Sequence, residues 1–244
     1  MSQPYPHYDH APITEAVIDI RVTQSQTSSV DNLKDLPVGD SYPTIEPLHL
    51  NVGQFQWGPN PSATTSTQHT GFLYRSADAK QIFQAQTGGF SLSRLTPYES
   101  WDPFSAEAKR LWDVYKSKSD PINIVRMALR YINRIDIPLP VKDFKDYLRT
   151  VPEVSPDLPQ GLSGYLMQLA IPLESINGMA IISETIVPPP SADFVSILLD
   201  IDVSVEGVTS PQNPLVWETF DRLRNKKNEV FEACITDNTR ELFK

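Results

Sequence analysis

Three arginines stand four residues apart in the middle of the chain, within residues 123–140. Apolar and polar side chains alternate through this stretch with a period of two, which predicts a long strand with all three guanidinium groups on one face. At ~3.3 Å per residue, neighbouring arginines are ~13 Å apart and the outer two ~26 Å apart. An extended anionic ligand or an acidic segment of a partner could contact all three, whereas one small anion could not. The predicted ligand- or partner-binding residues are therefore Arg126, Arg130, Tyr131, Asn133 and Arg134.

An alternative explains the same arginines without a ligand. Residues 194–206 alternate in the same way, with three acids on one face: Asp200, Asp202 and Glu206. If the two strands are neighbours, acids and arginines pair across them, and Asp19 and Arg21 of the first strand could join. Exposed pairs of this kind contribute less than ~1 kcal/mol each. A binding surface and an internal network of ion pairs both remain open.

Residues for nucleophilic or metal chemistry are few. The four histidines are His7, His10, His49 and His69. His7 and His10 are three residues apart, but no further ligand is spaced to complete a metal site, so we expect neither a metal nor a cofactor. The single cysteine, Cys234, lies in an apolar helical pattern, and no nucleophile elbow or glycine-rich phosphate loop occurs. The 30 acidic residues leave an enzyme that acts through paired carboxylates as a third alternative.

The composition limits the class of protein. The chain has 244 residues, a net charge of −9 and 40% hydrophobic residues, which is typical of a globular protein. Nucleic-acid binding is not expected, because a surface that contacts phosphates needs clustered lysine and arginine. No stretch of 18 apolar residues and no signal-peptide pattern is present, so we expect a cytoplasmic protein that does not contact a membrane.

The elements that must position these residues follow from periodicity and from breaks at proline and glycine. Each half of the chain is predicted to run in the order strand, short helix, several antiparallel strands and long helix. In the first half, strands are expected at 16–22, 45–57, 70–76, 81–87 and 90–95, and helices at 30–36 and 101–118. In the second half, strands are expected at 124–137, 163–173, 179–187 and 194–205, and helices at 141–150 and 213–235.

This order predicts an α+β fold of two similar β-α-β(3-4)-α halves, in which a long helix covers each antiparallel sheet. The halves are residues 1–120 and 121–244, fused into one globular unit, and their similar order indicates an internal duplication. The leading strands 16–22 and 124–137 could pair at the centre. The arrangement resembles the helix-grip and TATA-binding-protein class of folds.

Several segments are similar to one protein family. They are Ala11-Pro12-Ile13-Thr14-Glu15-Ala16, Tyr98-x-x-Trp101, Arg126-x-x-Leu129-Arg130-Tyr131-Ile132-Asn133-Arg134-Ile135, Asn228-x-x-Phe231 and Ile235-Thr236-Asp237. The chain resembles a sporadically distributed bacterial and archaeal family of uncharacterised proteins of about this length. The central Leu-Arg-Tyr-Ile-Asn-Arg-Ile motif is the most specific part of the resemblance. A sporadic distribution is typical of mobile gene cassettes, including defence systems and toxin–antitoxin pairs.

The resemblance therefore implies a prokaryotic, non-enzymatic binding protein, an accessory or neutralising partner of another protein encoded beside it. A sensor of a small ligand or nucleotide, with a pocket between helix and sheet, is the alternative function. A homodimer is an alternative assembly, formed through an unpaired edge of a sheet.

Overall fold

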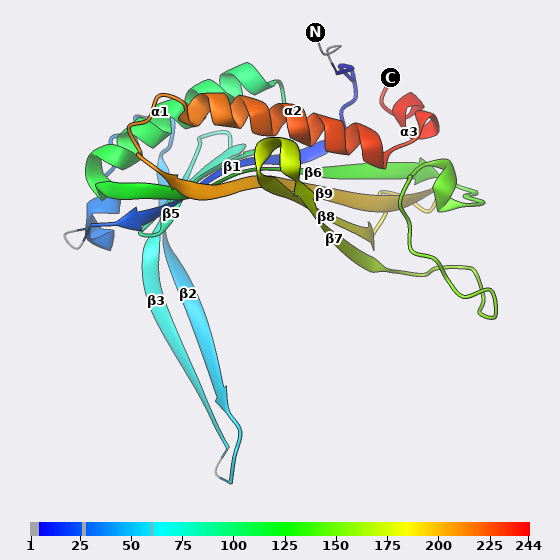
Figure 1. Ribbon diagram of the computed structural model, residues 1–244, viewed down its shortest axis with the longest axis horizontal. Coiled ribbons are helices and arrows are strands. Elements are labelled where there is room, and N and C mark those ends of the chain that lie inside the picture. Colours follow the sequence, from blue (N-terminus) through cyan, green and yellow to red (C-terminus); the bar gives the residue numbers. More distant parts are fainter. Residues whose placement is uncertain (1–4, 26–27, 60) are drawn as a thin grey trace.

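The computed structural model describes residues 5–25, 28–59 and 61–244, and its centre is one antiparallel sheet of nine strands (Figure 1). The strands lie in the order β2-β3-β4-β5-β1-β6-β9-β8-β7. Their bounds are β1 Ile13–Gln24, β2 Thr44–Gln56, β3 Ser62–Arg75, β4 Gln81–Gln86, β5 Gly89–Leu95, β6 Pro121–Pro138, β7 Leu166–Leu173, β8 Gly178–Val187 and β9 Phe194–Thr209. The helices of the described residues are α1 Trp101–Ser119, α2 Val216–Cys234 and α3 Asp237–Glu241, with 3₁₀ turns at Val30–Leu33, Phe144–Asp146 and Glu174–Ile176.

The predicted fold of two helix-covered β-α-β halves is wrong, because the strands form a single sheet. β1 pairs with β5 on one side and with β6 on the other, and β6 pairs in turn with β9. Backbone hydrogen bonds therefore continue across the expected boundary at residue 120. Alternation in a sequence indicates which face of a strand is buried, but it does not indicate where a sheet ends. The expected pairing of the two leading strands is present, with Ile18 opposite Leu129.

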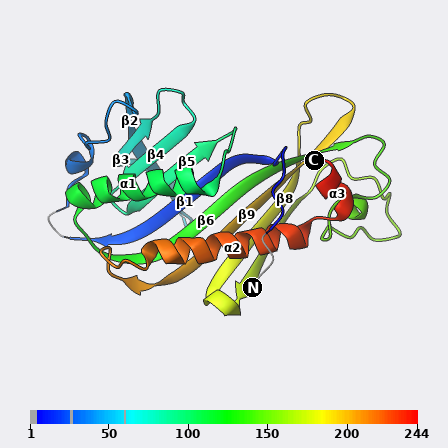
Figure 2. The same ribbon diagram turned by 90° about the horizontal axis from the view of Figure 1, so that it is seen from above.

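Both long helices lie on the same face of this sheet, α1 against β5 and α2 against β6 and β9 (Figure 2). The alternating apolar side chains of β1, β6 and β9 point toward the helices, as Ile18, Leu129 and Ile201 illustrate with no exposed surface. Burial of each such side chain contributes ~1.5–3 kcal/mol. The opposite face of the sheet carries the charged residues, so the core and the arginines occupy different sides.

The start of β6 departs from the predicted alternation. A register shift separates Ile124 from Arg126 where β6 pairs with β9. Because this irregularity changes which side chains face the helices, Ile124 is fully buried, although the prediction put Val125 on the apolar face. From Met127 onward the predicted alternation is observed.

β2 and β3 form a long hairpin at one edge of the sheet, and its outer part projects away from the other strands and the helices (Figure 1). The strand expected at 70–76 begins earlier than predicted, because β3 starts at Ser62 and pairs with β2 from there onward. The many threonines of this stretch favour extended backbone because their side chains are branched at Cβ. Residues 47–74 contain no charged side chain, and Phe55 and Trp57 near the tip are 77% and 91% exposed.

The helix expected at 141–150 is a single 3₁₀ turn. The Asp143 carboxylate accepts a hydrogen bond from the backbone N–H of Lys145, a local bond that satisfies the turn without a longer helix. The short helix expected at 30–36 is likewise a 3₁₀ turn, Val30–Leu33. In the part of the chain that the structure describes, no helix is both long and apolar enough to span a bilayer.

Candidate functional site

Arg126 and Arg130 project from the open face of the sheet and bond to acids of β9. Arg126 Nη2 donates to both oxygens of Asp202, at 3.0 and 3.1 Å, and its Nη1 donates to Asp19 of β1 at 3.3 Å. Arg130 donates to Asp200 through Nε at 2.8 Å and Nη2 at 2.5 Å. In the register of the two strands, Glu206 lies directly opposite Arg126 and Asp202 lies directly opposite Arg130. Each arginine therefore bonds to an acid of β9 that is diagonal to it.

Arg134 has a different set of partners. Its Nε donates to Asp136 on the same strand at 2.9 Å, and its Nη2 donates to the Pro188 carbonyl and the Ser196 hydroxyl. The cross-strand ion pairs that the alternative explanation expected are thus present for Arg126 and Arg130. A role of the three arginines in partner binding stays a prediction.

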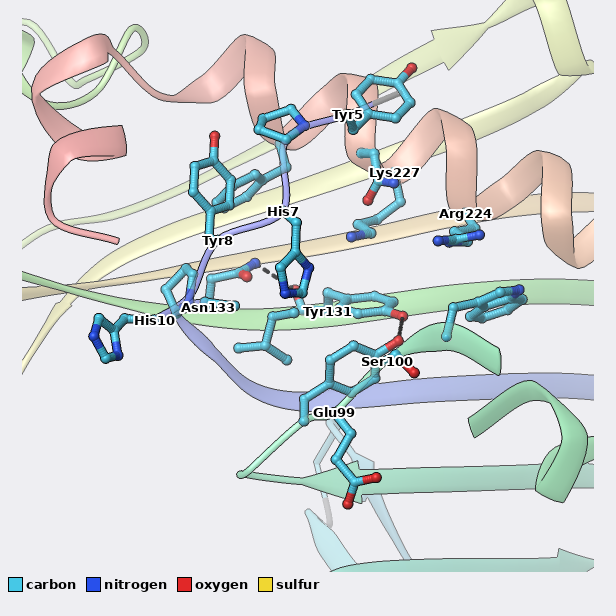
Figure 3. Close-up of a pocket in the computed structure, with 18 of the residues that line it drawn as sticks. Tyr5, His7, Tyr8, His10, Glu99, Ser100, Tyr131, Asn133, Arg224 and Lys227 are labelled. Atoms are coloured by element: carbon cyan, nitrogen blue, oxygen red, sulfur yellow. Dashed lines mark hydrogen bonds between the residues drawn. The ribbon is translucent and has the colours of Figure 1, made fainter. Parts of the chain in front are cut away.

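Tyr131 and Asn133 lie on the other face of β6, where they line a pocket of about 610 Å³ under α2 (Figure 3). The sheet forms the floor, α2 forms one wall, and residues 96–101 form another. Residues 5–13, the N-terminal arm, close the remaining side. Asn133 holds the floor together, because its Nδ2 donates to the carbonyls of Tyr131 and Leu199.

Contacts with the rest of the molecule hold the N-terminal arm in place. The backbone N–H of His10 donates to the Phe243 carbonyl at 3.0 Å, and the N–H of Arg134 donates to the Pro12 carbonyl at 2.8 Å. The Tyr8 ring packs edge-on against Phe243. These contacts bring His7 and His10 to the pocket, where His7 points toward Tyr131 and Asn133 (Figure 3). No cluster of three or more candidate metal ligands occurs among the described residues.

Two tyrosines meet inside the pocket, Tyr131 from its floor and Tyr98 from the wall formed by residues 96–101. The hydroxyl groups of Tyr98 and Tyr131 are hydrogen-bonded at 2.7 Å, and the two rings meet edge to face. Burial raises the pKa of both hydroxyls, and for Tyr131 the neighbouring Tyr98 raises it further. Both groups therefore stay protonated at neutral pH and can donate hydrogen bonds.

Lys227 is the most unusual residue of the pocket. Its side chain extends from α2 toward Tyr131, and its Nζ lies 3.9 Å from the centre of that ring (Figure 3). The residue is only 8% exposed, and within residues 5–25, 28–59 and 61–244 its amine has neither a carboxylate partner nor a hydrogen bond. Burial, reinforced by the charge of Arg224, lowers the pKa of Lys227 to about 7, against a smaller opposing effect of Glu232.

Arg224 adds a second cationic group one helical turn away. Its guanidinium carbon lies 5.7 Å from the centre of the Trp101 ring, and the Trp101 indole donates to Asp221 at 2.9 Å. No ion pair of Arg224 with an acid occurs in the described part of the chain. The guanidinium group of Arg224 gives the pocket a positive charge.

Two of the three acids that line the pocket, Glu99 and Glu232, bond elsewhere, and the third is Asp9 of the N-terminal arm. Glu232 accepts hydrogen bonds from Tyr8 and from Arg240, both at 2.8 Å. Glu99 points away from the cavity and accepts from Arg94. Among the described residues, the pocket therefore combines aromatic surface with two cationic groups, Lys227 and Arg224, that form no ion pair with an acid.

The sequence prediction included Tyr131 and Asn133 but missed Lys227 and Arg224. Residues 222–228 entered the prediction only as part of the helix expected at 213–235. A signal was available: Lys227 falls at helical spacing within an otherwise apolar stripe. The members of this stripe are Phe220, Leu223, Lys227, Phe231 and Cys234. A lysine at a core position of an amphipathic helix indicates a buried amine.

The three predicted arginines thus lie on one face of β6, and the predicted binding residues Tyr131 and Asn133 lie on the opposite face, in the pocket.

The chain matches no protein-family model and no curated protein. The resemblance to a bacterial and archaeal family stays a prediction from the segments quoted above.

Proposed function

We propose that this protein binds a small anionic ligand with a planar ring in the pocket between α2 and the sheet. The observation that supports this most directly is Lys227, whose amine is buried against Tyr131 and has no acidic partner in the described chain. The function is therefore binding, in the class of small-ligand sensors.

The energetics of a buried ammonium favour an anionic ligand. Removing such a charge from water costs several kcal/mol unless an opposite charge is close. The face of an aromatic ring returns only part of this cost, on the order of 2 kcal/mol. A ligand carboxylate, sulfonate or phosphate would supply the missing charge for Lys227, and Arg224 could bind it through two parallel hydrogen bonds. The rings of Tyr98, Trp101 and Tyr131 would contact a planar group.

Binding of the fluorescent anion 8-anilinonaphthalene-1-sulfonate tests this proposal. The titration is run in a Trp57→Ser background, because Trp57 is the most exposed aromatic residue outside the pocket. Lys227→Met and Arg224→Met should each weaken binding by about tenfold or more. Lys226→Met is the matched control, since Lys226 is the sequence neighbour and pairs with Glu229. Equal affinity of all variants would exclude the pocket as the binding site.

A second candidate function, binding of another protein, is favoured by the β2–β3 hairpin. Its tip exposes Phe55 and Trp57 on a charge-free ribbon, and a large exposed apolar patch is typical of interaction sites. The resemblance implies a partner from the same gene cassette, in a defence or toxin–antitoxin setting in the cytoplasm. The arginines Arg126, Arg130 and Arg134 are the proposed polar contacts.

Co-expression with the proteins encoded next to this chain tests the second candidate. Phe55→Ser with Trp57→Ser should abolish copurification of one neighbour, and Arg130→Glu should reduce it. Lys145→Glu, which changes another exposed cation paired with Glu153, should have no effect. Copurification that none of these substitutions reduces would exclude both surfaces.

A further inference from the structure

The Nζ atom of Lys227 is a primary amine inside a cavity, and in the described part of the chain it lacks the ion pair that would normally keep it charged. An amine in such surroundings can act as a nucleophile toward a carbonyl carbon. We propose that Lys227 forms a reversible imine with the aldehyde of a planar ligand, while Arg224 binds an anionic group on the same ligand. This inference rests on the proposed ligand-binding function and names the chemical class of the ligand.

The arrangement of the pocket supports this assignment. Lys227 and Arg224 are three residues apart on α2, so their side chains leave the same face of the helix and enter the same cavity (Figure 3). The amine stands above the face of the Tyr131 ring, and Arg224 lies beside the Trp101 ring. A flat ligand can therefore lie along these aromatic surfaces with its aldehyde at Lys227 and its anion at Arg224. A cavity of about 610 Å³ is ample for such a molecule.

The state of the amine is consistent with nucleophilic attack. A pKa of about 7 leaves a large fraction of Lys227 neutral at physiological pH, whereas an exposed lysine is almost entirely charged. The charged and titratable groups that line this pocket come from every surrounding element. Besides Lys227, they are Tyr5, His7, Tyr8, Asp9 and His10 of the arm, Tyr98 and Glu99 of the loop, Tyr131 of β6, and Arg224 and Glu232 of α2.

The proposed step is balanced without any oxidant or reductant. The lone pair of Nζ forms a bond to the aldehyde carbon, the carbonyl oxygen takes up a proton, and the nitrogen loses one, which gives a carbinolamine. Loss of the hydroxyl group as water, with loss of the second proton from nitrogen, gives the imine. Amine and aldehyde are thus converted to imine and water, and hydrolysis reverses the reaction. The Tyr98–Tyr131 hydroxyl pair beside the amine can donate a proton to the oxygen.

Reductive trapping tests this inference with two aldehydes of different size, pyridoxal 5′-phosphate and 4-formylbenzoate. The full chain is incubated with each aldehyde, reduced with sodium borohydride and analysed by intact mass and peptide mapping. We expect one saturable adduct on Lys227, formed at least about tenfold faster than on Lys226 or Lys145. Arg224→Met should slow the labelling of Lys227 by both anionic aldehydes by about tenfold. Benzaldehyde has no anionic group, so it should label the natural chain and the Arg224→Met variant at the same rate.

Lys227→Arg is the matched variant, because it keeps a positive charge but cannot form an imine. It should lose the adduct and retain binding of 8-anilinonaphthalene-1-sulfonate. Labelling spread over the exposed lysines, or no adduct on Lys227 with either aldehyde, would overturn the inference. The proposed function would still hold if, in that case, 8-anilinonaphthalene-1-sulfonate binds the natural chain and Lys227→Met weakens its binding. Only the formation of an imine would then be wrong.

Discussion

The amine of Lys227 lies 3.9 Å from the centre of the Tyr131 ring, on the side of the strand opposite the arginines. The negatively polarised face of this ring makes a favourable electrostatic contact with the buried ammonium group. Since a cation–π contact returns less than the desolvation of an ammonium costs, the pKa of Lys227 falls. One pair of residues from distant parts of the chain thus determines the chemistry of the pocket.

The free energy of unfolding should depend on pH through Lys227. The pKa of this lysine is about 7 in the folded chain and ~10.4 in the unfolded chain, so the unfolded state binds more protons between these values. The contribution of Lys227 to stability therefore rises with pH through this window. The stability of Lys227→Met should not rise with pH in this window. Below pH ~7 this variant should be more stable than the natural chain by an amount on the order of 4 kcal/mol. Urea denaturation of both proteins between pH ~6 and ~10 measures this, and parallel curves would contradict it.

Glu184 should show the opposite dependence. Burial raises the pKa of its carboxyl group, and the Tyr165 hydroxyl donates to it at 2.5 Å. A raised carboxyl pKa contributes stability below the unfolded value of ~4.3, and this contribution is lost as pH rises through the folded value. Glu184→Gln keeps an acceptor for Tyr165 without the charge, so it should be at least as stable as the natural chain at neutral pH. Thermal unfolding at acidic and neutral pH tests this, and a Gln variant that is much less stable at neutral pH would contradict it.

The arginine network should contribute little to stability. Arg126 is shared between Asp19 and Asp202, whereas Arg130 pairs with Asp200 and its side chain is 46% exposed. Exposed ion pairs are worth ~1 kcal/mol or less and weaken with salt. Arg130→Met should therefore lower the free energy of unfolding by less than ~1 kcal/mol. Denaturation at low and high ionic strength measures this change, and a much larger loss would mean that the network is structural.

The two tryptophans Trp57 and Trp112 should behave differently on substitution. Trp57 is almost fully exposed at the hairpin, and Trp112 is buried against Phe90 and Tyr115. Trp57→Ser should change the free energy of unfolding by less than ~0.5 kcal/mol, whereas Trp112→Ala should lower it by ~3–5 kcal/mol. Chemical denaturation monitored by circular dichroism distinguishes the two. A large loss of stability on Trp57→Ser would contradict this prediction and show that the outer part of the hairpin contributes to the stability of the whole chain.

Local sequence patterns predicted most of the individual elements. The alternation of 127–137 identified β6 and its buried face, and the helical stripes identified α1 and α2. Proline and glycine marked most of the breaks. Such patterns are local, since a strand or helix is defined by the spacing of apolar residues along a few turns or pleats. They did not reveal that β3 begins at Ser62, because a run of serine and threonine is compatible with either a loop or a strand.

The sequence by itself determined which residues of β6 are buried from Met127 onward, where the two long helices lie along the chain, and that acids of β9 could meet the arginines. Only the tertiary structure decided that the strands join into one sheet of nine and that the N-terminal arm folds back to Phe243. It also brought Lys227 of α2 over Tyr131 of β6. These relationships join residues far apart in sequence, and periodicity within a segment contains no information about which distant segment will cover it.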